Sequence, residues 1–341
     1  MNELMVRVYE DGGNPRLESD IVRTPTGFCV RALKSSSVMN VEIVNPTGAP
    51  IETEIEIECG SSYLSEIRNY LFLQSADDRI VYMDAPTKGT RQCARVAVPP
   101  GSHCLCINQR YELGRLNRLL DSLDKSRFAV KVIGQSRMGR DMYGIEAGNP
   151  SVRPITIVTR IHPYETPGSF FVEGMLNYLN SDAGAELLRE HRFGFMPMAN
   201  PDGVAMGHSY LTCGGLNLSA DVRMTNEPEA VALREFFLSL NPYLTVDFHG
   251  WMHRYDDNMT TNSRVRGKAL YEAMIPYTRA LEIQYAEYPL SGGVNNIGGI
   301  MIDKCGADFF NCSWTPRGRS VKQLHEIGVA FLKALAASPH A

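Results

Sequence analysis

The first hundred or so residues alternate between apolar and polar side chains with a period of two. Short runs of this kind, rich in β-branched residues, occupy 41–44 and 51–58, and turn-forming clusters at 45–48 and 99–101 separate them from their neighbours. Such alternation puts the apolar side chains on one face of a strand. The pattern predicts antiparallel strands in an all-β sandwich, which we assign to residues 1–108 as an N-terminal domain.

Beyond this region, the pattern changes to helices that alternate with strands. Leucines spaced three and four residues apart predict a helix over 111–124, and the unbroken apolar run 155–159 (ITIVT) is typical of a strand covered on both faces. The alternation indicates an α/β sheet with helices on both faces, in a second domain over 109–341. We predict further strands at 128–133, 141–146, 193–198, 244–248 and 299–303, and further helices at 169–179, 227–240, 268–281 and 321–336.

Two of the predicted strands are followed directly by residues that bind metals. His162 and Glu165 come just after the strand 155–159, and His249 follows the strand 244–248. Ligand sites in an open α/β sheet form beyond the carboxyl ends of the strands, so both segments deliver their side chains to one edge. Two imidazoles and one carboxylate are the ligand set of catalytic zinc sites, which keep a fourth position for water. We therefore predict one Zn²⁺ per chain, bound by His162, Glu165 and His249.

Four motifs resemble, in their order and spacing, those of the zinc carboxypeptidase (M14) family, and the cytosolic carboxypeptidase branch is the most similar. The resemblance covers roughly residues 111–336, and in that branch a β-sandwich also precedes the catalytic domain. It implies a mixed, mainly parallel central sheet and hydrolysis of a peptide or related amide bond. The motifs are GQSRMGR at 134–140, RIHPYET at 160–166, NPDG at 200–203 and DFHG at 247–250.

The stretch after the third motif departs from the family pattern at its substrate-binding positions. The arginine with which the family polarises the scissile carbonyl falls on Tyr210, and the Asn-Arg pair that grips the terminal carboxylate falls on Ser219 and Ala220. These side chains cannot make the bidentate contacts that a guanidinium makes with a carboxylate. Either another arginine binds the substrate, for which Arg223 and Arg254 are nearest in sequence, or the substrate has no free α-carboxylate there.

The general base is displaced as well. The family has a glutamate at the carboxyl end of the last major strand, before a loop and the terminal helix. One alignment takes FFNCSW as that strand and puts Ser313 or Trp314 in this place, which removes the base. The other alignment takes 299–303 and puts Asp303 there, with a following loop of about the family's length. We prefer the second alignment, in which Asp303 activates the water and returns its proton to the leaving amine.

Three further residues belong to the expected site or its border. Tyr288 precedes PLSGG and resembles the mobile active-site tyrosine of the family, whose phenol could hydrogen-bond the substrate. His208 is expected to line the substrate pocket as a polar side chain and not as a metal ligand. We expect Asp247, two residues before His249, to point away from that histidine.

The composition excludes several other classes of function. Lys and Arg number 34 and Asp and Glu number 38, which gives a formal net charge of −4 and no long basic run for nucleic acid. The acidic N-terminus lacks the apolar core of a secretory signal, and no segment approaches about 18 apolar residues in a row, so no membrane contact is predicted. Eight cysteines without CxxC spacing indicate free thiols. We predict a cytoplasmic protein.

The predicted function is a zinc-dependent hydrolase that cleaves an amide bond with metal-activated water. The missing arginines favour an unusual substrate, such as a side-chain amide, a small-molecule conjugate or a modified peptide. Two alternatives stay open at this point. One is a binding or regulatory protein that keeps the metal and has little or no activity, and the other is a deacylase or esterase on the same scaffold.

Overall fold

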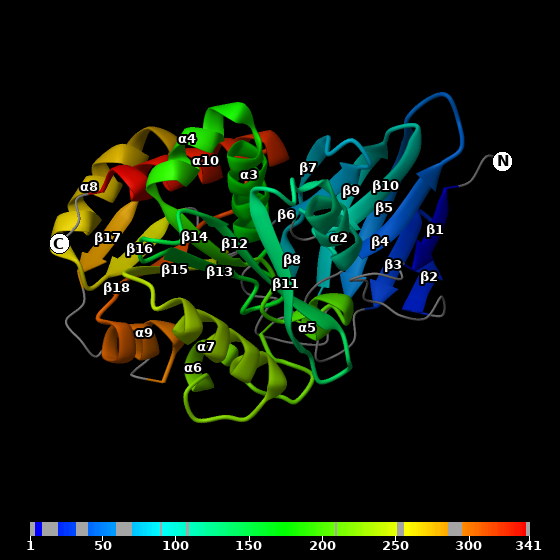
Figure 1. Ribbon diagram of the computed structural model, residues 1–341. Helices are drawn as coiled ribbons and strands as arrows, with labels where there is room; N and C mark the ends of the chain where they lie inside the picture. Colours follow the sequence, from blue (N-terminus) through cyan, green and yellow to red (C-terminus); the bar gives the residue numbers. More distant parts are fainter. Residues whose placement is uncertain are drawn as a thin grey trace.

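The computed structural model describes most of the chain (Figure 1). The described residues are 4–8, 20–31, 40–58, 70–88, 91–106, 109–208, 210–250, 256–285 and 295–338. Two residues of the expected site, Arg254 and Tyr288, lie outside these ranges.

The N-terminal region consists of two five-stranded sheets packed face to face, as the alternating pattern predicts. In β9, every second side chain is buried, and the apolar side chains of both sheets form one core. All strand pairs are antiparallel except β3 and β5, which are parallel. One sheet has the order β1 (Met5–Val8), β4 (Asn40–Asn45), β10 (Gly101–Cys106), β6 (Tyr70–Ser75) and β7 (Ile80–Asp84); the other has β2 (Ile21–Arg23), β3 (Gly27–Arg31), β5 (Ile51–Glu58), β9 (Arg91–Val98) and β8 (Thr87–Lys88).

The α/β region is built on one eight-stranded mixed sheet. Its centre is parallel, because β14, β13, β15 and β18 pair in parallel, whereas β11, β12 and β16 add antiparallel pairs on either side. The strands in order are β11 (Phe128–Gln135), β12 (Asp141–Gly148), β14 (Arg192–Met196), β13 (Ile155–Thr159), β15 (Leu244–His249), β18 (Asp308–Ser313), β16 (Asn258–Thr261) and β17 (Glu282–Tyr285).

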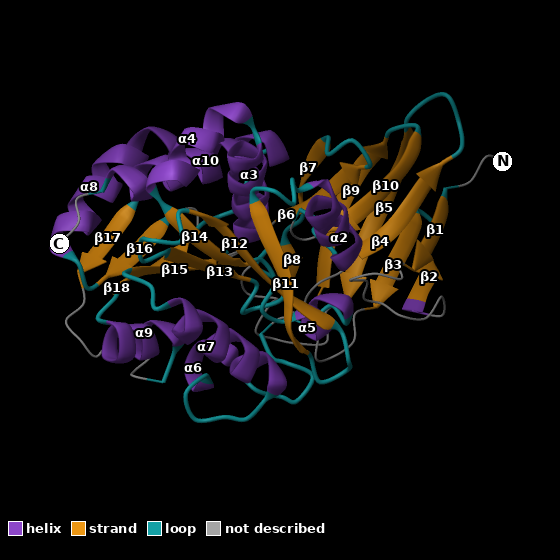
Figure 2. Ribbon diagram, in the orientation of Figure 1, coloured by secondary structure: helices purple, strands orange, loops and turns teal. Residues whose placement is uncertain are grey.

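Helices cover both faces of this sheet (Figure 2). On one face α3 (Pro167–Asn180), α4 (Asp182–Glu190), α8 (Arg264–Met274) and α10 (Val321–Ala337) share a large apolar core with the sheet. On the other face α6 (Leu218–Asp221), α7 (Pro228–Leu240) and α9 (Ile297–Cys305) form a second core. The short helices α2 (Leu113–Ser122) and α5 (Pro201–Ala205) complete the domain. The predicted fold class, a zinc carboxypeptidase-like α/β domain after an all-β region, is confirmed.

The predicted strand at 299–303 is wrong, because these residues belong to helix α9. Asn296 caps the helix by accepting a hydrogen bond from the Gly299 amide at 2.7 Å, and Gly306 ends it with a positive φ of 62°. A capping asparagine and a left-handed glycine about ten residues apart are helix boundaries. The predicted helix at 268–281 is also too long, since α8 ends at Met274 and a 3₁₀ turn and β17 follow.

The strand next to β15 is instead β18, which contains FFNCS. It runs parallel to β15, and Ser313 is the register partner of His249. The alternative alignment, with FFNCSW as the last major strand, is therefore the one that the fold has.

Partly buried ion pairs and buried hydrogen bonds join the sandwich to the α/β region. Arg115 of α2 binds Asp78 of the sandwich and Glu173 of α3, with N–O distances of 2.8–2.9 Å. Gln109 donates to the carbonyl oxygens of Pro316 and Arg319. These contacts fix the sandwich against the loop that follows β18.

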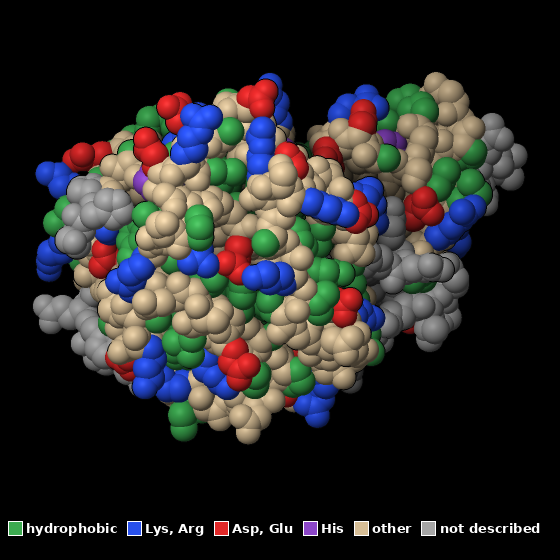
Figure 3. Space-filling model, viewed as in Figure 1, with side chains coloured by type: hydrophobic (Ala, Val, Ile, Leu, Met, Phe, Trp, Pro, Cys, Tyr) green, Lys and Arg blue, Asp and Glu red, His purple; other side chains and the backbone are tan. Residues whose placement is uncertain are grey.

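The surface and the cysteines agree with the composition. Basic and acidic side chains are interspersed on the face shown in Figure 3, without a large area of one sign. The seven cysteines within the described ranges are free thiols. None of the described helices combines the length and apolar character needed to cross a membrane.

Candidate metal centre

The loop between β13 and α3 carries two of the three predicted ligands. Its first residue, Arg160, has a positive φ of 61°, which turns the chain sharply at the end of the strand. The buried Arg160 guanidinium donates to the carbonyl oxygens of Pro163 and Tyr111, at 2.8 and 2.9 Å, and to the Ser169 hydroxyl. Because the guanidinium holds the loop from inside, the side chains of His162 and Glu165 both face the same space.

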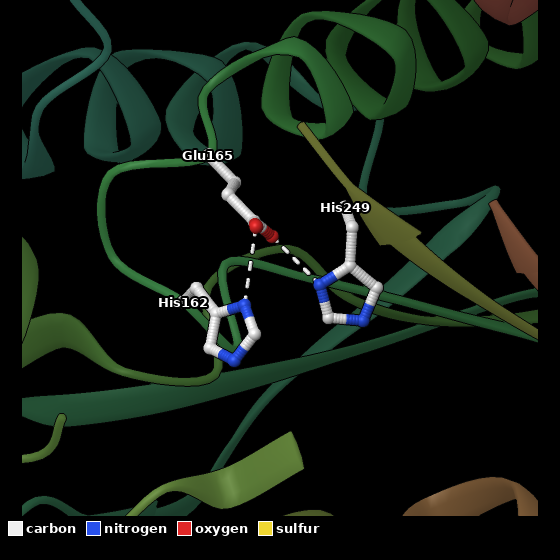
Figure 4. Close-up of side chains that lie close together, drawn as sticks. All are labelled: His162, Glu165 and His249. Atoms are coloured by element: carbon white, nitrogen blue, oxygen red, sulfur yellow. Dashed lines mark hydrogen bonds and ion pairs between the residues drawn. The ribbon is translucent and has the colours of Figure 1, made fainter. Parts of the chain in front are cut away.

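His162, Glu165 and His249 meet at the carboxyl edge of the sheet (Figure 4). All three are buried, with exposed fractions of 8%, 2% and 4%. Their potential ligand atoms lie within 4.8 Å of one another. The Glu165 carboxylate lies between the rings, with Oε1 at 3.1 Å from His162 Nδ1 and Oε2 at 2.7 Å from His249 Nδ1.

The other nitrogen of each imidazole has an acceptor of its own. His162 Nε2 lies 3.2 Å from Asn217 Oδ1, and His249 Nε2 lies 3.1 Å from Asp247 Oδ2. Acceptors at both Nε2 atoms favour a proton there, which leaves each Nδ1 lone pair directed at the cluster. The expectation that Asp247 points away from His249 is wrong, because residues two apart in a strand share a face.

The electrostatics of the cluster match this arrangement. Burial alone would raise the pKa of Glu165, but the two histidines hold it well below its ordinary value. Burial would lower the pKa of His249, but the carboxylates of Asp247 and Glu165 raise it well above its usual range. The charge of His249 is thus balanced by two carboxylates, and a cation bound at its Nδ1 atom would meet the same Glu165 oxygen.

The donor set fits a zinc ion. Two Nδ1 lone pairs and a carboxylate, all buried and converging, are the three protein ligands of a catalytic zinc site. Asn217 and Asp247, which accept hydrogen bonds from the Nε2 atoms, are the partners that orient such histidines. This geometry agrees with the predicted ligands His162, Glu165 and His249.

Tyr210, which takes the place of the family's polarising arginine, lies beside the cluster. Its ring packs edge-on against His162 with the ring centroids 4.9 Å apart, and its hydroxyl accepts from the Tyr164 hydroxyl at 2.9 Å. Ser219 lies in the first turn of α6, where its amide donates to Asn217 Oδ1. His208 is half-buried, and its amide donates to the Gly203 carbonyl. None of these side chains carries a positive guanidinium.

Asp303 and Arg223 bind each other. The Arg223 guanidinium donates to Asp303 Oδ2 at 2.6 Å, and both side chains are about 30% exposed. Asp303 lies two residues before Cys305, whose carbonyl accepts from Arg153 near the beginning of β13. It is therefore close to the amino ends of the strands, at the edge opposite His249. This placement contradicts the prediction that Asp303 ends a strand beside the metal ligands and serves as the base there.

Ser313 ends β18 next to His249. Cross-paired residues of parallel strands face the same side of a sheet, so the Ser313 side chain is on the side of the His249 ring. It is 2% exposed, and its hydroxyl has no hydrogen-bond partner among the described residues. Trp314, the other candidate for this position, is buried in the core on the opposite face with α3 and α10. A neutral hydroxyl thus stands where the family has its glutamate.

The sequence did not predict the supporting roles of three site residues. Asn217, Arg160 and Asp247 support the metal ligands, although two of them lie inside motifs that were identified. For Asp247 the signal was available, since the period of two in β15 puts it beside His249. For Asn217, which is 55 residues from His162, only the folded chain shows the contact. The motif arginine Arg140 and the buried Asp202 form an ion pair at 2.7 Å, which joins the turn between β11 and β12 to α5.

The comparisons with known proteins agree with this fold and site. Residues 116–223 match the family model of zinc carboxypeptidases. Cytosolic carboxypeptidase 6 of Mus musculus is 29% identical over 174 residues, which are 42% of this chain and 32% of that protein. The chain spans about a third of the length of the curated relatives it matches.

Solved structures share the architecture over almost the whole chain. A metallo-carboxypeptidase from Burkholderia cenocepacia superposes with a TM-score of 0.82 at 18% identity, covering 97% of both chains. A metallo-carboxypeptidase from Pseudomonas aeruginosa, in complex with (2-guanidinoethylmercapto)succinic acid, gives 0.79 at 16% identity over 97% of this chain and 98% of that one. At this identity the likeness shows the fold.

The fold is zinc carboxypeptidase-like, and the buried His-Glu-His cluster lies at the carboxyl edge of its sheet. The predicted resemblance to this family, with cytosolic carboxypeptidases among the relatives, is confirmed. The family match over residues 116–223 agrees with the predicted metallo-hydrolase.

Proposed function

We propose that this protein is a zinc-dependent hydrolase that cleaves an amide bond in a substrate without a free α-carboxylate at the cleavage end. The observation that carries the proposal is the convergence of His162 Nδ1, His249 Nδ1 and the Glu165 carboxylate in a buried site. A zinc ion held there polarises a carbonyl group and lowers the pKa of water to near neutrality. The protein's own contribution is to fix both imidazoles in the required orientation through Asn217 and Asp247.

The charges near the cluster support a substrate that is neutral at this end. Three arginines of the motifs and the expected site have other partners: Arg160 binds the loop carbonyls, Arg140 binds Asp202, and Arg223 binds Asp303. Tyr210 stands at the position of the family's polarising arginine, and Ser219 and Ala220 stand at the positions that recognise a terminal carboxylate in the family. Hydroxyl groups can donate to a carbonyl or amide oxygen, but they supply no positive charge. A side-chain amide, a conjugate of a small molecule or a blocked peptide suits such a surface.

The first test is metal content and hydrolysis in the same preparations. We expect about one zinc per chain in the wild type, none in His162→Ala, and an unchanged content in His191→Ala, which alters a histidine after α4. Peptides and small amides with blocked ends should be hydrolysed faster than the same compounds with a free carboxylate. Absence of zinc from the wild type after zinc is supplied would reject the site. Preference for free carboxylates would reject the substrate class alone.

A second candidate is favoured by one observation, the serine at the end of β18. With Ser313 beside His249 and no base at Asp303, the protein could bind zinc without rapid hydrolysis, as a binding or regulatory protein. It would then take up zinc with the same ligands but show no turnover of blocked amides. Parallel assays with matched esters separate a third possibility, a deacylase or esterase. The cytoplasmic location remains part of the proposal, and the name of the cytosolic relatives supports it.

A further inference from the structure

The loop that carries two metal ligands reaches into the core of the N-terminal sandwich. Tyr164, between His162 and Glu165, is 3% exposed and is buried in the apolar cluster formed by sandwich strands, with residues such as Phe28 and Ile55. Tyr210 packs against the same cluster. Both tyrosines come from the α/β region, whereas the other members of this cluster precede residue 106. The sandwich core therefore extends up to the metal-binding loop.

The two tyrosines connect this core to a metal ligand. The Tyr164 hydroxyl donates to the Tyr210 hydroxyl at 2.9 Å, and the two rings pack edge-on with their centroids 4.9 Å apart. Tyr210 packs in the same way against His162, again at 4.9 Å. Edge-to-face aromatic pairs and a buried hydrogen bond each restrict the orientation of the rings that take part. The contacts run without a gap from the sandwich through Tyr164 and Tyr210 to His162.

The segment that contains Tyr210 holds His162 from two sides. Tyr210 packs edge-on against the imidazole, and Asn217 accepts from its Nε2 atom at 3.2 Å. In zinc carboxypeptidases this segment carries the arginine that faces the substrate. Here the corresponding side chain, Tyr210, is bonded to Tyr164 and packed into the interface between the two regions.

We infer that Tyr164 and Tyr210 are positioning residues that couple the N-terminal sandwich to the metal centre. Packing of the sandwich against Tyr164 fixes Tyr210, and Tyr210 fixes the ring of His162 in its ligand orientation. Metal affinity then depends on the sandwich, and by linkage the metal stabilises the sandwich against local opening by the same factor. The inference rests on the proposed function only in requiring that zinc binds to His162, Glu165 and His249.

Zinc affinity of the full chain, measured by competition with a chromophoric chelator, tests the coupling without reference to activity. Tyr164→Phe and Tyr210→Phe each remove one side of the same hydrogen bond, so we expect each to weaken zinc binding by about 5-fold. The double variant should be weakened by less than the product of the two single factors, because the two hydroxyls share one hydrogen bond. Tyr164→Ala removes the ring and should weaken binding by about 10-fold or more.

Phe72→Ala is the matched control for loss of a buried sandwich ring. Phe72 is fully buried in a separate apolar cluster with Tyr70, Cys104 and Cys106, which does not include Tyr164. This variant should lose stability but keep the zinc affinity of the wild type. As a reciprocal readout, zinc should slow hydrogen exchange of the β5 and β9 amides in the wild type, and Tyr164→Ala should lose most of that protection.

The outcomes separate the coupling from the site itself. Wild-type affinity in the folded Tyr164 and Tyr210 variants would overturn the coupling and leave the zinc site in place. Equal weakening in Tyr164→Ala and Phe72→Ala would also overturn it, because general destabilisation would then account for the loss. A wild type that takes up no zinc would overturn the proposed function and the coupling with it.

Discussion

Two neighbouring parts of the molecule differ in what they have kept of the carboxypeptidase pattern. At the ends of β13 and β15, the three metal ligands and the groups that orient them form a complete buried site. At the end of β18 and in the segment 208–223, the positions that contact the substrate in the family hold neutral or already paired side chains. Under the proposed function, binding the metal and recognising a carboxylate are separable properties of this fold.

The largest expected effect concerns the metal side of the comparison. Glu165→Gln keeps the shape of the side chain but removes the charge that both Nδ1 atoms face. Groups that only orient metal ligands contribute about 10–100-fold to affinity, so we expect loss of the ligand charge to weaken zinc binding by more than about 100-fold. Chelator competition measures the change. An affinity within a factor of ten of the wild type would mean that Glu165 is not a ligand.

Helix α3, which follows Glu165, carries a glutamate whose contribution to stability depends on pH. Glu173 of α3 is buried, which would raise its pKa, but Arg115 and His325 lower the pKa to about 2 from 4.5. A lowered pKa gives stability that is complete above the unfolded value and is lost as the pH falls toward the folded value. Between pH 5 and pH 2 the wild type should lose about 3 kcal/mol of unfolding free energy through this group.

Denaturant unfolding at several pH values measures this loss. Glu173→Gln should be less stable than the wild type at neutral pH and should lack this part of the acid dependence. Glu186→Gln, at an exposed position of α4, controls for the change in charge. If the unfolding free energies of the wild type and Glu173→Gln changed with pH in parallel, the ion pairs of Glu173 would not be the source of acid-dependent stability in this region.

Ser313→Glu tests the substrate side directly. It returns a carboxylate to the strand end beside His249, and a positioned general base contributes about 100-fold or more to the rate. We expect hydrolysis of a blocked amide to rise by about 100-fold, with Ser313→Gln, of the same size but without a base, as the control. Equal rates in the two variants would show that another group already serves as the base.

The smallest effect is expected for Asp303 and Arg223, which the sequence predicts as the general base and as a candidate for substrate binding. Asp303 and Arg223 form a partly exposed ion pair, and such pairs contribute about 0–1 kcal/mol. Asp303→Asn should change the unfolding free energy by less than about 1 kcal/mol and leave the rate of hydrolysis unchanged, as should Arg223→Gln. A rate loss of tenfold or more in Asp303→Asn alone would restore Asp303 as the base.

The misplacement of Asp303 shows where sequence patterns are ambiguous. The run 299–303 is short and apolar. Its periodicity alone does not distinguish a buried strand from a buried segment of a helix. Asn296 and Gly306 are the boundary signals that decide for the helix. The competing run, FFNCS, contains the β-favouring aromatic residues of β18, but its place beside β15 depends on pairing with a strand about 60 residues earlier.

The sequence by itself determined the sandwich, the α/β alternation and the three residues of the metal cluster, because each follows from a local pattern: alternation of period two, apolar runs, and ligand types at strand ends. The tertiary structure decided that Ser313 and not Asp303 ends the strand beside His249, that Asn217 orients His162, and that Tyr164 enters the sandwich core. These contacts join residues far apart in the chain. Which of these contacts form depends on which surfaces pack and pair most favourably, and a local pattern does not contain that information.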